Sequence, residues 1–113
     1  MPDQTVDVTF SPTADPQFTF TPDEVTMTAA GKVIFHRRPP TATWLFTGGD
    51  VENDTQQEFS VSVQGNGTSL HIRDEFKDQR KTRYKYTLSV QLDGTSYTSP
   101  DPHIVNDPGG GGG

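Results

Sequence analysis

The chain contains no cysteine, and this absence excludes one group of stabilising and reactive sites. Its 113 residues can form neither disulfides nor thiolate metal sites. The absence does not fix the compartment, because many proteins in every compartment lack disulfides.

Long apolar runs are also lacking. No segment approaches the roughly 20 apolar residues that a membrane-spanning helix needs. The first residues, M-P-D-Q-T-V-D-V-T-F, have neither the basic nor the apolar region of a signal peptide. We therefore expect a soluble, cytoplasmic protein that has no membrane partner.

Basic side chains are few. The chain has 9 Lys and Arg residues against 15 Asp and Glu residues, which gives a formal charge of −6. Nucleic acid is not an expected partner, because binding to phosphates needs a basic field. Six of the nine basic residues lie between residues 73 and 85, so this segment carries +3 and the rest of the chain −9. Such a dipolar surface could orient a protein partner or a second copy of the chain.

The apolar residues follow the period of β-strands. Leu, Ile, Val and Phe make up only 23 of the 113 residues, but 16 threonines, which also suit strands, help to explain this low number. Apolar and polar residues alternate in segments such as 6–10, 25–29, 57–63 and 84–92. This pattern predicts seven to nine short strands in an all-β, antiparallel, two-sheet sandwich of immunoglobulin-like type, with a small barrel or a jelly roll left open.

The domain organisation follows from the length and from the end of the chain. A chain of 113 residues fits one domain, which we expect to cover residues 1–106. Residues 107–113 end in five glycines, which predicts a flexible tail with nothing to bury.

Residues 83–105 are expected to form a hairpin against which the other strands pack. Apolar side chains occupy every second position from Tyr84 to Leu92, as in a strand with one buried face. Asp93-Gly94 tolerates the positive φ angles of a type I′ turn. This turn sets the register, which pairs Leu92 with Thr95, Val90 with Tyr97 and Leu88 with Ser99.

The return strand of this hairpin ends in P-D-P-H. Pro100 and Pro102 have no backbone N–H to donate, so ordinary pairing cannot continue past them. Asp101 and His103 could belong to a functional site. We interpret this ending as a strand stop instead, in which Asp101 accepts hydrogen bonds from nearby backbone.

Asn66-Gly67 is a second hairpin signal. As a two-residue loop it would pair Val63 with Leu70 and Val61 with Ile72. A Gly65-Asn66 loop would keep the same faces but shift the partners, and the pattern alone does not choose between them.

The C-terminal third resembles a known family. Its segments Y-K-Y-T-L-S-V and T-S-Y-T-S-P-D-P-H-I-V-N are similar to the C-terminal region of the DP-EP family of small bacterial proteins, which has no assigned function. His103 stands where an acidic residue would fit the family name better. The resemblance implies a bacterial source and a β-sandwich, and it implies no catalytic residues.

Asp50, Glu52 and Asp54 follow two glycines in a predicted polar loop over residues 48–54. Carboxylate oxygens are the ligands that calcium prefers. The spacing matches no EF-hand, and acidic loops in acidic proteins are usually only solvated. A calcium site in the 50–58 loop is therefore the alternative hypothesis.

No sequence pattern indicates catalysis. His36, His71 and His103 lie on different predicted strands and face outward, and no G-x-S-x-G motif occurs. We predict no enzyme and no cofactor. The first hypothesis is a non-catalytic β-sandwich module that acts through protein contacts or self-association, using exposed edge backbone or the charged 73–85 segment. The alternative is a small-ligand or calcium-binding domain that uses the 50–58 loop.

Overall fold

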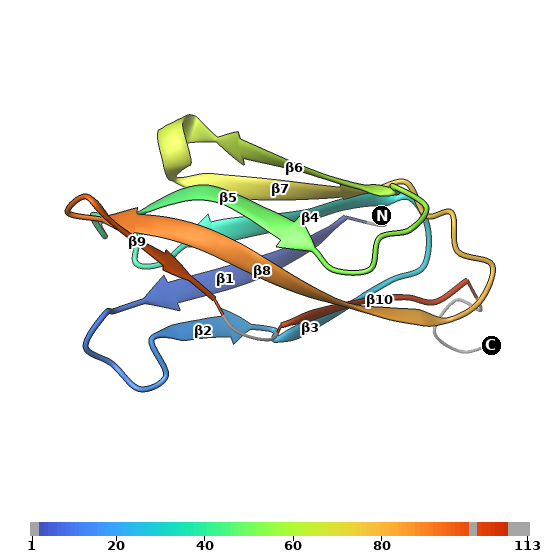
Figure 1. The fold of residues 1–113 in the computed structure, drawn as a ribbon, viewed down its shortest axis with the longest axis horizontal. Coiled ribbons are helices and arrows are strands. Elements are labelled where there is room, and N and C mark those ends of the chain that lie inside the picture. Colours follow the sequence, from blue (N-terminus) through green and yellow to red (C-terminus); the bar gives the residue numbers. More distant parts are fainter. Residues whose placement is uncertain (1–2, 100–101, 109–113) are drawn as a thin grey trace.

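The computed structural model describes residues 3–99 and 102–108, which form a sandwich of two β-sheets (Figure 1). The elements are β1 (Gln4–Phe10), β2 (Phe18–Thr21), β3 (Glu24–Met27), β4 (Gly31–Arg37), β5 (Leu45–Val51), β6 (Phe59–Gln64), the 3₁₀ turn η1 (Gly65–Gly67), β7 (Ser69–Asp74), β8 (Thr82–Leu92), β9 (Thr95–Thr98) and β10 (His103–Asn106). The predicted all-β sandwich of immunoglobulin-like type is confirmed. The described residues form ten strands rather than seven to nine, and the last of them, β10, pairs with β3 and β8 after Pro102.

Both sheets are mixed rather than purely antiparallel. Their strand orders are β2-β1-β4-β7-β6 and β3-β10-β8-β5, and β9 also pairs with β8. Two pairings are parallel, β1 with β4 and β10 with β3. The first of these arises because the chain leaves β2, crosses to the second sheet as β3 and returns as β4, beside β1 and in the same direction. Neither sheet closes into a barrel.

The core lies between the two sheets and is built by the alternating side chains of the strands. Phe35 of the first sheet and Tyr86 of the second are both completely buried, and their ring centroids lie 5.3 Å apart. Trp44, just before β5, is 3 % exposed, and its ring packs edge-on against Phe46. Burial of one large apolar side chain contributes roughly 1.5–3 kcal/mol, so this layer dominates the stability of the domain.

Both predicted hairpins are confirmed, the first with its register and the second with one of the two registers that the pattern left open. β8 and β9 pair Leu92 with Thr95 and Val90 with Tyr97, and the N–H of Ser99 donates to the carbonyl of Leu88 at 2.8 Å. β6 and β7 pair Val63 with Leu70 and Val61 with Ile72. The second turn is longer than expected, since η1 and Thr68 lie between the paired ends Gln64 and Ser69.

The predicted polar loop over residues 48–54 is wrong in its first half. Residues 48–51 continue β5 along β8, after a shift of register between Phe46 and Gly48. Gly49 explains why a strand can pass here, because a Cβ atom at this position would lie 2.9 Å from the carbonyl oxygen of Thr87. Gly49 therefore permits close pairing, and neither glycine marks a turn.

The expected glycine-rich tail lies largely outside the described residues, as does Asp101. Within the described ranges, no helix is long and apolar enough to cross a membrane. The segment 75–81 carries the chain from β7 in the first sheet to β8 in the second.

Candidate functional site

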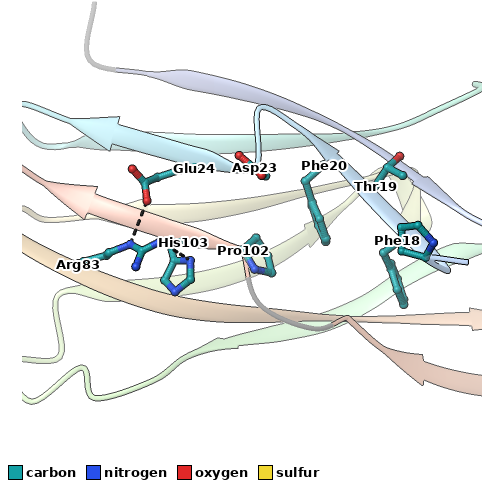
Figure 2. Close-up of a pocket in the computed structure, with 9 residues that line it drawn as sticks. Phe18, Thr19, Phe20, Asp23, Glu24, Arg83, Pro102 and His103 are labelled. Carbon is teal, nitrogen blue, oxygen red and sulfur yellow. Dashed lines mark hydrogen bonds and ion pairs between the residues drawn. The ribbon is translucent and has the colours of Figure 1, made fainter.

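A groove of about 480 Å³ opens where the outer strands of the two sheets approach each other (Figure 2). β2 is the outer strand of the first sheet, and β3 is the outer strand of the second. The start of β8 and the start of β10 complete the groove. The lining residues are Pro16, Phe18, Thr19, Phe20, Asp23, Glu24, Arg83, Pro102 and His103.

One end of the groove is charged. The register of β10 places His103 opposite Glu24 of β3, and Arg83 projects from β8 on the far side of β10. Arg83 Nε donates to Glu24 Oε2 at 2.9 Å, and Arg83 Nη2 lies 3.3 Å from His103 Nδ1. The side chains of Arg83 and Glu24 are 60 % and 45 % exposed, so water weakens their attraction. A ligand carboxylate could therefore replace Glu24 as the partner of Arg83 at small cost.

The other end of the groove is apolar. Phe20 is half-buried and stacks on Phe18, with ring centroids 6.2 Å apart and an angle of 8° between the ring planes. Figure 2 shows Phe20 and Pro102 between the charged group and Phe18. These rings offer a surface for an apolar side chain of a ligand.

Tyr86 lies next to the groove with an unused hydrogen-bond donor. Its ring meets Phe20 edge-on at 6.2 Å, and its hydroxyl is buried without a hydrogen-bond partner. Burial raises the pKa of Tyr86, and the negative charge of Asp23 raises it further. The hydroxyl therefore stays protonated at any physiological pH.

The groove brings charged, polar and aromatic groups together. It combines a guanidinium, an imidazole, two carboxylates and two phenylalanine rings. Among the described lining residues, Thr19 carries a hydroxyl group. This hydroxyl hydrogen-bonds to the hydroxyl of Thr9 instead of to a base. Nucleophilic catalysis would require a nucleophile beside such a base.

The structure places Asp50, Glu52 and Asp54 in different settings. Asp50 is an exposed residue of β5, and Glu52 Oε2 lies 3.6 Å from Lys85 Nζ. The two carboxylate oxygens of Asp54 accept the backbone N–H groups of Glu58 and Phe59 at 3.0 and 3.1 Å. Asp50 and Asp54 border one hollow of about 250 Å³, and Glu52 does not line it. The three predicted ligands are therefore not brought together as one set.

Sequence reasoning missed the groove because its residues come from three distant parts of the chain. The sequence places His103 after a strand stop and Arg83 in a charged segment, and no local pattern links either residue to Phe18 or Phe20. The sequence signal that could have indicated the groove is a pair of prolines. Pro16 and Pro102 interrupt the chain beside β2 and β10, where ordinary pairing would otherwise continue.

The fold is a small two-sheet β-sandwich with a groove at its side. The family model of the DP-EP family matches residues 2–108, and the chain belongs to this family. The similarity thus covers nearly the whole chain rather than only its C-terminal third. No curated protein matches the chain.

Proposed function

We propose that the protein is a non-catalytic binding module that holds an extended segment of a protein, either a partner or a second copy of itself, in the groove between β2 and β3. The observation that carries this proposal is the position of the groove between two outer strands. An outer strand has unpaired backbone N–H and C=O groups on one side, to which an extended peptide can add.

The groove also suggests which peptide would bind. Its volume of about 480 Å³ suits a few side chains. An apolar side chain would pack on Phe20 and Pro102, and a carboxylate would bind Arg83 and His103. We therefore propose an extended segment with an acidic residue next to an apolar or aromatic one.

Peptide selection tests this proposal. A displayed library of random peptides is selected on the full chain, and the affinities of single peptides are then measured with Arg83→Gln and with Phe20→Thr. We expect each substitution to weaken binding about tenfold or more. Arg83→Gln removes a charge-assisted hydrogen bond, which is worth about 1.5–3 kcal/mol, and Phe20→Thr removes an apolar surface whose burial is worth roughly the same.

Arg73→Gln is the matched control. Arg73 is exposed on β7 in the first sheet and lies in the same charged segment, but it does not line the groove. Peptides that bind the Arg83 and Phe20 variants as tightly as the unmodified protein would contradict the proposal.

Self-association is tested separately by light scattering after size exclusion, across a series of salt concentrations. If the partner is a second copy, we expect dimers at low salt that dissociate as salt screens the charged end of the groove. A strict monomer at high protein concentration and low salt would exclude a second copy and leave a different protein as the partner.

The calcium alternative has weaker support, because Glu52 pairs with Lys85 and Asp54 is used by the backbone. We also propose a bacterial source, which the family resemblance supports, and a cytoplasmic location.

A further inference from the structure

A buried polar cluster lies at the end of the sandwich where residues 75–81 cross from β7 to β8 (Figure 1). It consists of Glu58, Asp74, Asp78, Tyr84 and Asn106. Glu58, Asp74 and Asn106 are at most 1 % exposed. The cluster joins both sheets and the crossing segment, and it shares no residue with the groove.

The side-chain amide of Asn106 lies among three carboxylates. Its Nδ2 atom is 3.0 Å from Glu58 Oε1, 3.2 Å from Asp74 Oδ1 and 2.9 Å from Asp78 Oδ2. The amide has two hydrogens, so it can donate to two of these three oxygens. One carboxylate is therefore left without this donor.

The hydroxyl of Tyr84 also has more carboxylate oxygens around it than it has hydrogens to donate. It lies 3.0 Å from Glu58 Oε2 and 2.8 and 2.7 Å from the two oxygens of Asp78. A phenol has one hydrogen to donate. The side-chain amide of Gln56 adds donors, because its Nε2 atom lies 2.8 Å from Asp78 Oδ1 and 3.5 Å from Glu58 Oε2. Even with these donors, Asp74 Oδ2 has no hydrogen-bond partner.

Basic side chains do not supply the missing positive charge. The backbone N–H of Lys77 donates to Glu58 Oε1 at 2.9 Å, but its ammonium lies 3.8 Å from Glu75 and 3.3 Å from the carbonyl of Gln56. The other salt bridges of the described chain are Arg38 with Asp7, Arg83 with Glu24, and Lys85 with Glu52.

A metal ion is not indicated as the source of that charge. The part of the chain that the structure describes has no group of three or more His, Cys, Asp or Glu side chains placed so that it could hold one. Protonation of a carboxyl group would lower the charge of the cluster without a metal ion.

Two buried oxygen atoms without a hydrogen-bond partner indicate which carboxyl group carries the proton. Asp74 Oδ2 and Asn106 Oδ1 are buried without a hydrogen-bond partner, while Asp74 Oδ1 accepts the N–H of Phe76 at 2.9 Å. An ionised oxygen buried without a partner is strongly unfavourable. A hydroxyl at Asp74 Oδ2 would remove that charge and supply a donor.

We propose that Asp74 holds a proton in the folded protein, and that Glu58, Asp74, Asp78, Tyr84 and Asn106 form a clasp that fastens the crossing segment to both sheets and weakens when this proton leaves. Loss of the proton adds a negative charge to a buried cluster that already holds two other carboxyl groups.

The titration of the cluster supports this proposal. Burial is the main cause that raises the pKa of Asp74 from 3.8 to about 6, and the charges of Glu58 and Asp78 raise it further. Burial also raises the pKa of Glu58 and that of Tyr84, so the phenol stays protonated. β10 contributes Asn106, which does not titrate.

The proton on Asp74 makes the stability of the folded protein depend on pH. Between about pH 4 and pH 6 the folded chain holds a proton on Asp74 that the unfolded chain has released. Acid therefore favours the folded state in this window, and stability falls as the pH rises through it. Above pH 6 both states have lost the proton and this contribution is gone.

Urea unfolding of the full chain between pH 4 and pH 8 tests the clasp. Over this range we expect the unfolding constant of the unmodified protein to rise about a hundredfold relative to that of Asp74→Asn, the factor that a pKa of about 6 against 3.8 implies. Asp50→Asn, at an exposed acid of β5, is the control and should keep the profile of the unmodified protein. Parallel profiles for the unmodified protein and Asp74→Asn would overturn the proposal.

Two further measurements keep the test decisive if Asp74→Asn does not fold. In the unmodified protein, the carboxyl carbon resonance of Asp74 should titrate near pH 6, and a midpoint at or below pH 4 would overturn the proposal. Urea unfolding with calcium chloride and with EDTA should give the same stability. A protein that is stabilised by calcium at pH 8 and loses this stabilisation in Glu58→Gln would show that the cluster binds a cation instead of a proton.

Discussion

The guanidinium of Arg83 reaches across β10 to Glu24, and its Nε atom lies 2.9 Å from Glu24 Oε2 although the two residues are 59 positions apart. Both side chains are partly exposed to water. The pair is therefore better suited to exchange with a ligand than to hold the strands together.

We predict that Glu24→Gln changes the free energy of unfolding by about 0.5 kcal/mol or less, because exposed ion pairs contribute little. Urea unfolding at pH 7 measures this change. The same substitution should strengthen the binding of acidic peptides, since it frees Arg83. A loss of stability of roughly 2 kcal/mol would show instead that the pair fastens β3 to the sheet.

Gly49 should tolerate no side chain. An added Cβ would lie 2.9 Å from the carbonyl oxygen of Thr87 and 3.0 Å from Leu88 Cδ2, so Gly49→Ala must displace backbone. We expect a loss of about 1–3 kcal/mol in urea unfolding.

The neighbouring glycine is the control for this prediction. A Cβ at Gly48 would have no atom within 4 Å, and Gly48→Ala should change stability by about 0.5 kcal/mol or less. Equal effects at the two positions would contradict the close approach of β5 to β8.

Removal of the Tyr86 hydroxyl should not destabilise the protein. This hydroxyl is buried without a hydrogen-bond partner, and Tyr86→Phe removes it while the ring stays in the core. We expect an unchanged or higher melting temperature in calorimetry, because an unsatisfied buried polar group costs about 1–3 kcal/mol. A clear fall in melting temperature would mean that the hydroxyl has a partner in solution.

We expect Asp54 to stabilise the fold and not to bind calcium. Its carboxylate accepts the backbone N–H groups of Glu58 and Phe59, so Asp54→Ala should destabilise the protein by about 1–2 kcal/mol. Titration of the unmodified protein with calcium should give no heat. A saturable heat that Asp54→Ala abolishes would favour the calcium alternative for the 50–58 loop.

Local patterns were sufficient to predict the class of fold and both hairpins. In β8 the alternation from Tyr84 to Leu92 continues into a turn whose residues accept positive φ, and Asp93 has φ 51°. A turn of this kind sets the register of the strands that it joins, so the partners of Val90 and Leu92 could be named in advance.

Long-range arrangements could not be predicted in this way. The parallel pairing of β1 with β4 depends on the route of the chain through the other sheet, which leaves no mark on either strand. The buried cluster joins Glu58 to Asn106 across 48 positions. One local signal was present, since Asp74 follows Leu70 and Ile72 at the spacing of the buried face, where a carboxyl group is not expected.

β10 lies between β3 and β8, and β3 pairs with no other described strand. During synthesis, β3 therefore cannot pair with β10 until residue 106 has left the ribosome, about 80 residues after β3 itself. The first sheet is complete much earlier, with β7. We expect the nascent chain to pass through a state in which the first sheet is complete and the second is not. In that state part of the apolar face of the first sheet is exposed until β10 completes the second sheet.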